Sequence, residues 1–245
     1  MKAGWIEMPN WVENFTYVIG SEARRKEFVD AVNGSRPDRP SLANLWPMPS
    51  CLVDTTSPPY KTPEPDAEWL ERLSSNLMTA EQYDNAVRHR QQEYEKGQAA
   101  FEETGFTNWY DWSLSNWGTK WSDCDTEIYD HYKDHVTTVR YNTAWSPAED
   151  LIRRISAKFP DLVFVTCISE ETYDFAGCFI YAAGIHLDSV GLETSRYRTD
   201  ANENELSHDD WLLRYEDMVE KIECDLADLA MELVDKYVGE YLGGK

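Results

Sequence analysis

The stretch 35–65 carries eight of the chain's eleven prolines. Proline lacks a backbone N–H and fixes φ, so it interrupts both helices and the interior of sheets. Regular structure is therefore excluded over most of this stretch, which we predict to be a long Pro-rich loop. The helices and strands of the fold must come from residues 1–34 and from the chain beyond residue 65.

Local signals place the first elements on either side of this loop. Residues 11–19, WVENFTYVI, are β-branched and aromatic and predict a strand. Ser21 then caps a helix that is expected to stop at Asn33 and Gly34. Beyond the loop, helix is predicted over 67–78.

A capping box formed by Thr79 and Gln82 predicts a second helix after the loop, running to Thr104 and ending at Gly105. Its apolar stripe is narrow, which favours packing at the edge of the fold or in a helical hairpin. The residues of this stripe are Tyr83, Val87, Tyr94 and Phe101.

Four further strands and a helix are predicted between residues 137 and 190. Alternation over 137–143 and the apolar runs 162–168 and 174–184 indicate strands, with a short one near 186–190. Ser146 and Glu149 fit a capping box that starts a helix running to Lys158. This order predicts an α+β fold of the ferredoxin-like type, with helices on one face of a mainly antiparallel sheet.

The last part of the chain carries one apolar helical seam. Tyr215, Val219, Ile222, Leu226, Leu229 and Leu233 recur at spacings of three and four. A helix over 208–241 would be about 50 Å long, so it either bends around the sheet or meets another helix. The second helix is the predicted one at 80–104 or belongs to another copy of the chain, which would form a homodimer through the 215–233 seam.

These elements divide the chain into four predicted parts. They are a ferredoxin-like sandwich made of 1–34 and 106–199, the Pro-rich loop 35–65, a helical insertion at 66–105, and an acidic amphipathic helix at 207–242.

Four stretches resemble one protein family. They are MPNWVENFTYVIG at the start, DWSLSNWGTKW at 111–121, YNTAWSP at 141–147, and FPDLVFVTCISEETYDFAGCFIYAAG at 159–184. Together they resemble the YubB-like family of plasmid and phage proteins. The resemblance implies a ferredoxin-like domain and a mobile-element setting, and it brings no catalytic residue with it.

The net charge of the chain limits the classes of partner that it can bind. The 245 residues include 45 acidic and 23 basic ones, a formal net charge of −22. Such a chain is repelled by phosphate backbones and anionic lipid, so we expect no direct nucleic-acid or membrane partner and a basic protein partner instead. The start of the chain lacks the long apolar stretch of a signal peptide, and the five cysteines are scattered without a C-x-x-C motif. We therefore expect a cytoplasmic protein with neither a disulfide framework nor a zinc site.

Much of the negative charge lies in the predicted C-terminal helix, where a helical wheel places acids across from the apolar seam. Such a face could imitate a nucleic-acid backbone and occupy a basic groove, and it could equally serve solubility. Our leading hypothesis is a non-enzymatic inhibitor of a host nucleic-acid-handling defence protein, which acts through this face and the adjoining helices at 61–105. The face comprises Asp209, Glu216, Asp217, Glu220, Glu223, Asp228 and Asp235.

A tryptophan-rich segment supports an alternative function. Trp112, Trp117, Trp121 and Trp145 could stack on a nucleotide or small ligand, with Lys120 or Arg140 near its phosphate. The same rings could instead fix a loop onto the sheet.

Catalytic and metal signals are weaker. His131 and His135 are four residues apart among carboxylates, which would suit a metal if the segment were helical. No nucleophile-elbow, phosphate-loop or zinc-protease motif occurs, and Glu170, Glu171 and Asp174 fit a hairpin turn as well as acid–base work. We therefore predict no enzyme activity, no metal and no cofactor.

Overall fold

The computed structural model describes residues 10–65, 67, 70–71, 79–197 and 208–243. The chain forms two compact units, one made of residues 1–46 and 117–245 and the other of residues 47–116. The first boundary falls within the Pro-rich loop, so its residues up to Trp46 belong to the first unit. Most of the helix predicted at 67–78 lies outside the described residues.

The first unit is built on a six-stranded antiparallel sheet with strand order β2-β3-β1-β4-β5-β6. The strands are β1 (Trp11–Ile19), β2 (Cys124–Lys133), β3 (Val136–Ala144), β4 (Val163–Glu170), β5 (Ala176–Ala182) and β6 (Ile185–Leu192). The order of β1, α1 (Glu22–Asn33), β2, β3, α5 (Glu149–Lys158) and β4 along the chain is the β-α-β-β-α-β order of ferredoxin-like folds. The predicted α+β ferredoxin-like class is confirmed, and β5 and β6 extend the sheet beyond β4.

Several predicted ends are confirmed by their caps. The Ser21 hydroxyl accepts a hydrogen bond from the Arg24 N–H, and Gly34, with φ of 53°, ends α1. The capping box expected after Ser146 is wrong, because the Ser146 hydroxyl donates to the Gly118 carbonyl and α5 starts without a side-chain cap. Strand β2 was not predicted as a strand.

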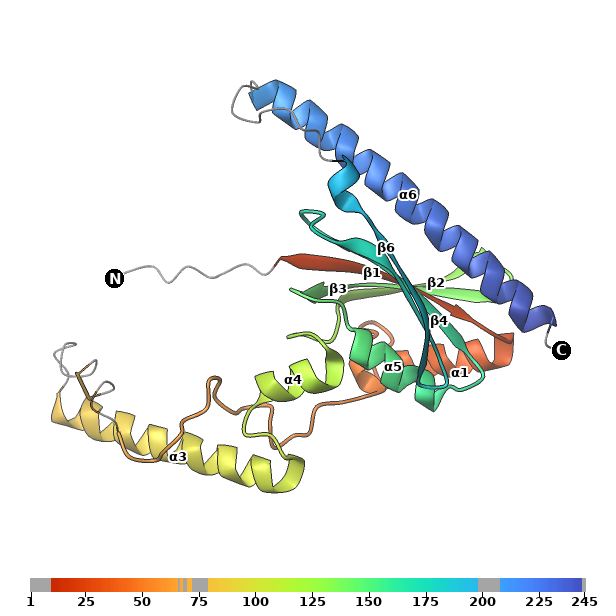
Figure 1. The fold of residues 1–245 in the computed structure, drawn as a ribbon. Helices are drawn as coiled ribbons and strands as arrows, with labels where there is room; N and C mark the ends of the chain where they lie inside the picture. The colour runs from red at the N-terminus through yellow and green to blue at the C-terminus, as the bar shows by residue number, and fades with distance from the viewer. Residues whose placement is uncertain (1–9, 66, 68–69, 72–78, 198–207, 244–245) are drawn as a thin grey trace. The chain divides into compact units, whose positions relative to one another are not determined.

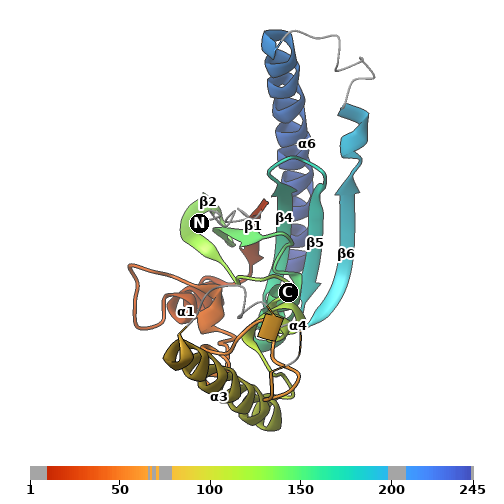
Figure 2. The same ribbon diagram turned by 90° about the vertical axis from the view of Figure 1, so that its left-hand side faces the viewer.

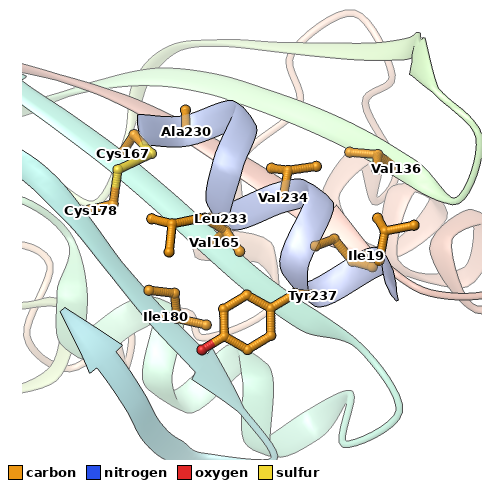
Figure 3. Close-up of a cluster of buried hydrophobic side chains, with 11 residues drawn as sticks. Ile19, Val136, Val165, Cys167, Cys178, Ile180, Ala230, Leu233, Val234 and Tyr237 are labelled. Carbon is orange, nitrogen blue, oxygen red and sulfur yellow. A yellow bond between two sulfur atoms is a disulfide. The ribbon is translucent and has the colours of Figure 1, made fainter. Parts of the chain in front are cut away.

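Helices cover both faces of the sheet. α1 and α5 lie on one face, and α6 (His208–Gly243) crosses the other (Figures 1 and 2). On the first face the Phe28 ring of α1 packs edge-on against Phe159 and Phe164. On the second face, Val234 and Tyr237 of α6 pack on Ile19, Val136 and Val165 (Figure 3).

The apolar seam of α6 therefore packs on the sheet of its own chain. Leu226, Leu229 and Leu233 contact the cluster over β1, β4 and β5, while Ile222 packs with Tyr173 and Ala176. The sequence was compatible with packing of the seam either on the sheet or on a second helix. In the structure, residues 222–241 pack on the sheet. The homodimer through this seam stays a prediction. The sheet of the same chain already covers these side chains, so a second copy would have to bind without direct access to them.

The second unit consists of the later part of the loop, α3 (Ala80–Thr104) and most of α4 (Trp109–Trp117). The predicted capping box of Thr79 and Gln82 is present, and Gly105 ends α3 with φ of 79°. The predicted apolar stripe is wrong, because Tyr83 and Phe101 are exposed. The buried face of α3 is instead mostly polar or small, and consists of Arg90, Glu93, Gly97 and Ala100.

Contacts within this unit explain that face. The Arg90 guanidinium lies 4.6 Å from the centre of the Tyr60 ring, and the Glu93 carboxylate accepts a hydrogen bond from Lys96 at 2.7 Å. A Cβ at Gly97 would lie 3.1 Å from the Thr107 carbonyl oxygen, so this glycine lets the chain pass close to α3.

Cys167 of β4 and Cys178 of β5 are directly paired in the sheet and form a disulfide, although the scattered cysteines predicted no disulfide framework. The bond lies in the core under α6 (Figure 3). Disulfides persist in oxidising compartments and are uncommon in the reducing cytosol. The cytoplasmic location stays a prediction.

Replacing both Cys167 and Cys178 with Ala is expected to lower the free energy of unfolding by about 2 kcal/mol, because the bond restricts a short loop of the unfolded chain. Urea unfolding of the variant beside Cys224→Ala, which removes an exposed free cysteine, would measure this difference. Thiol alkylation of the denatured, unreduced protein should label Cys51, Cys124 and Cys224 only. Labelling of all five cysteines would contradict the bond.

Candidate functional site

The outer face of α6 points away from the sheet and carries most of the predicted acidic residues. Glu216, Asp217, Glu220, Asp228 and Asp235 are exposed there. Asp209 lies in the first turn of the helix, and its side chain lies outside the described residues. Glu232 is an exposed acid on the same helix that the predicted face omitted, although its position on the helical wheel could have found it.

Two of the three basic residues of α6 form ion pairs with carboxylates. Lys221 donates to the Asp217 carboxylate at 2.6 Å, one turn earlier on the helix. Lys236 lies 3.9 Å from the carboxylate of Asp188 in β6. Both pairs are exposed and add little stability. Each pair neutralises one carboxylate, and the helix stays net negative because it carries eleven acidic and only three basic residues.

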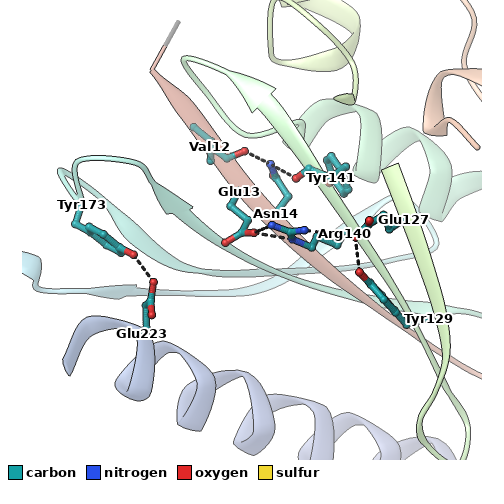
Figure 4. A network of polar contacts seen from close by, with 9 residues as sticks. All are labelled: Val12, Glu13, Asn14, Glu127, Tyr129, Arg140, Tyr141, Tyr173 and Glu223. Carbon is teal, nitrogen blue, oxygen red and sulfur yellow. Dashed lines mark hydrogen bonds and ion pairs between the residues drawn. The ribbon is translucent and has the colours of Figure 1, made fainter. Parts of the chain in front are cut away.

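Glu223 does not belong to the outer face, which corrects the prediction. Its carboxylate accepts a hydrogen bond of 2.7 Å from the Tyr173 hydroxyl, and so faces the sheet (Figure 4). Burial, together with this carboxylate, raises the pKa of Tyr173 above the ordinary value for tyrosine. The hydroxyl therefore stays protonated and continues to donate over the physiological pH range.

A second network lies on the same face of the sheet (Figure 4). Arg140 of β3 binds the Glu13 carboxylate of β1 at 2.6 and 2.7 Å, and its other amino group lies 3.4 Å from Glu127 of β2. The hydrogen bond to Glu13 raises the pKa of the Arg140 guanidinium, which stays charged. Arg140 is therefore neutralised by carboxylates and does not serve as the phosphate contact of a tryptophan-lined site.

The four tryptophans do not form one exposed platform. Trp112 and Trp117 are buried, and the Trp117 indole N–H donates to the Trp46 carbonyl at 2.9 Å. Trp121 and Trp145 are 38% and 46% exposed, and both lie beside the start of β1. The centre of the Trp121 ring lies 5.8 Å from that of Trp11, and the backbone N–H of Trp145 donates to the Asn10 carbonyl.

The helical arrangement that would place His131 and His135 on one face does not occur, because Cys124–Lys133 is the strand β2 and His135 lies in the turn that follows. Asp123, at the start of the acidic segment, has a structural role: its carboxylate accepts from the backbone N–H groups of Leu42 and Ala43 and caps the short helix η1 (Leu42–Asn44). Over the described part of the chain, no group of three or more His, Cys, Asp or Glu side chains is arranged to hold a metal.

Glu170 is buried in the β4–β5 turn rather than solvated. Its Oε2 accepts hydrogen bonds from the N–H and hydroxyl of Thr172 and from the N–H of Asp174. The carboxylate of Glu170 therefore organises the turn, and Glu171 and Asp174 are exposed beside it.

Comparison with known proteins bears on the first unit. Residues 116–209 match a family model described as a ferredoxin-like domain in Api92-like protein. This stretch is a ferredoxin-like domain. The match begins before β2 and extends past β6, so it covers most of the sheet whose strand order is ferredoxin-like. No helix described in the structure has the length and apolar character needed to cross a bilayer.

Among solved structures, the chain is similar to the crystal structure of a protein api92 from Yersinia pseudotuberculosis. The two are 13% identical, with a TM-score of 0.41 and coverage of 76% of this chain and 98% of that chain. No curated protein matches the sequence.

Proposed function

We propose that this chain is a plasmid- or phage-encoded cytoplasmic inhibitor that binds a basic, nucleic-acid-handling host defence protein through the outer face of α6. One observation carries the proposal: carboxylates line the face of α6 opposite the side that packs on the sheet. Packing of the opposite side on the sheet holds the helix in place, and the carboxylates themselves remain exposed. The target is a restriction, CRISPR-type or other defence complex, which is blocked by exclusion of its nucleic acid.

The charge density of the helix supports this proposal. α6 carries eleven acidic and three basic residues, a net charge of −8. Spread over about 54 Å of helix, this is roughly one negative charge per 7 Å. One DNA strand carries a phosphate about every 3.4 Å, so the helix reproduces about half its charge density. Such a surface attracts a basic groove over long range, and its row of charges partly reproduces that of the nucleic acid that the groove normally binds.

The structure sharpens which residues to test. Glu220, Asp228 and Glu232 are exposed, and no ion pair to any of them is seen in the described part of the chain. Glu223 is excluded from the face because it binds Tyr173. The alternative function, a ligand site at the tryptophans, keeps only Trp121 and Trp145 as accessible rings.

Reversing Glu220, Asp228 and Glu232 to Lys is expected to abolish inhibition, because repulsion replaces attraction at the partner's basic groove. The assay is the efficiency with which an unprotected plasmid enters cells that carry a restriction or CRISPR-type defence and express the protein. Wild type should raise this efficiency, and the triple variant should lower the gain about 100-fold.

A matched variant reverses Glu22, Glu27 and Asp30, which are exposed on α1 on the other face of the sheet. It changes the net charge equally and should keep inhibition. Full inhibition by the α6 variant, or equal loss in both variants, would refute the assigned face.

A further inference from the structure

A cavity of about 330 Å³ lies between α6 and the sheet, within the first unit. β1 contributes Glu13, Phe15 and Tyr17 to its wall, and Glu223 enters from α6. The cavity lies where α6 passes between its two clusters of apolar contacts, one around Ile222 and one around Val234. Its volume is within the range of small-ligand sites and is far larger than the space of a single water molecule.

The charges around this cavity are unbalanced. Glu13 and Glu223 face it, and Glu127 stands behind Glu13 with Arg140 as the shared cation. Three carboxylates against one guanidinium leave a net charge of −2. The bonds from Arg140 and Tyr173 both fall on Oε1 of their carboxylates, so Oε2 of Glu13 and of Glu223 can accept from a further donor.

The rest of the wall suits an organic cation. Phe15 and Tyr17 are two residues apart on β1 and present their rings to the same face of the sheet. The Arg140 guanidinium already lies 5.9 Å from the centre of the Phe15 ring, so one organic cation is held by a ring and a carboxylate beside the cavity. The α6 side is lined by the small residues Ala227 and Ala230, which leave room for an alkyl chain.

Inorganic cations suit this wall less well. Calcium takes six to eight oxygen ligands and magnesium a near-ideal octahedron, whereas apolar side chains make up much of this cavity. A guanidinium or alkylammonium uses the same wall fully, with donors for the two carboxylates and a face or stem for the rings.

We propose that this cavity binds the guanidinium or ammonium group of an organic cation, between the Glu13 and Glu223 carboxylates and against the Phe15 and Tyr17 rings. The group comes from a free amine or from an arginine or lysine side chain of a protein. This site is separate from the outer face of α6, and it stands or falls independently of the inhibitor function.

Calorimetric titration of the full chain tests the proposal, with butylguanidinium and butylammonium as probes and neutral butylurea as the uncharged analogue. The two cations should bind saturably and at least about tenfold more tightly than butylurea, a difference of about 1.4 kcal/mol. Equal binding of butylurea, or no saturable binding of either cation, would overturn the site.

Two variants of one helix provide the matched comparison. Glu223→Gln and Glu220→Gln each remove one charge from α6, but only Glu223 lines the cavity. The amide introduced by Glu223→Gln would keep an oxygen that accepts from Tyr173, so the local fold should persist. Butylguanidinium affinity should fall about tenfold in Glu223→Gln and stay within about twofold in Glu220→Gln. Equal effects would reduce the binding to bulk charge and refute the proposal.

Ala227→Leu provides a second test that leaves every charge in place. Ala227 is exposed at the edge of the cavity, and a leucine there should block it and reduce cation affinity with little effect on stability. Undiminished affinity would contradict the site. The source of the cation is separated by comparing free butylguanidinium with the peptide acetyl-Gly-Arg-Gly-amide. Tighter binding of the peptide supports a protein side chain, and tighter binding of the free cation supports a small molecule.

Discussion

Replacing Val234 with Asp is expected to lower the free energy of unfolding by about 4 kcal/mol or more and to release α6 from the sheet. Val234 is fully buried between α6 and the strands, with Ile19 and Val136 among its neighbours (Figure 3). A carboxylate there has no cationic partner in the cluster, and the burial of an unpaired charge is among the most destabilising single changes. Chemical unfolding followed by circular dichroism would measure the loss.

Two control variants separate the effect of the buried charge from the effects of lost volume and of surface charge. Val234→Ala removes two methyl groups without adding charge and should cost about 2 kcal/mol. Leu213→Asp makes the same kind of apolar-to-acid change on the same helix, at a side chain that is 65% exposed, and should stay within about 0.5 kcal/mol of wild type. A Val234→Asp protein as stable as Leu213→Asp would show that α6 does not pack on the sheet.

The same variants connect the fold to the proposed function. The outer face of α6 has a fixed position only because the opposite side of the helix is buried on β1, β4 and β5. Val234→Asp should therefore lose inhibition without changing any residue of the outer face, whereas Leu213→Asp should retain it.

The elements that the sequence predicted well are those whose ends are set by their own residues. Ser21, Thr79 and Gly105 satisfy or terminate backbone groups within one helical turn, so the signal and the structure share the same few residues. Ser146 has the same local pattern, but its hydroxyl donates to Gly118, which is 28 residues away. A capping rule based on neighbouring residues cannot include the Gly118 carbonyl, which competes for the Ser146 hydroxyl.

β2 was missed because it is the edge strand of the sheet. Its charged residues, such as Asp125 and Glu127, give no apolar alternation, and edge strands commonly carry charge to prevent further pairing. The ferredoxin-like prediction succeeded without β2, since the remaining strands and the resemblance pointed to the same class. The strand order became complete only with the structure.

Two predictions failed for the same physical reason: Glu223 was assigned to the outer face of α6, and no disulfide was expected. Glu223 follows the buried Ile222, so it lies only about 100° around the helix from the seam and can reach Tyr173 across it. Cys167 and Cys178 each lie three residues from the ends of the turn at Glu170 and Phe175, which brings them opposite each other in the hairpin. Both contacts depend on elements meeting in space. The symmetric spacing of the cysteines was nevertheless a usable signal in the sequence.

A second large effect is expected at Gly177, where the neighbouring strand leaves no room for a side chain. A Cβ added at Gly177 of β5 would lie 2.5 Å from the Val190 carbonyl oxygen and 2.9 Å from the Gly191 Cα, both in β6. Because these are backbone atoms, only a shift of the strand relieves the clash. Gly177→Ala should therefore lower the free energy of unfolding by about 3 kcal/mol.

The paired glycine supplies the control. Gly191 lies directly opposite Gly177 in the sheet, and a Cβ added to it would meet no atom within 4 Å. Gly191→Ala makes the same chemical change on the partner strand and should stay within about 0.5 kcal/mol of wild type. Amide hydrogen exchange should show faster exchange across the β5–β6 pairing in Gly177→Ala alone. Equal stabilities of the two variants would mean that β5 and β6 do not approach each other as the structure has them, since the close approach is on the Gly177 side only.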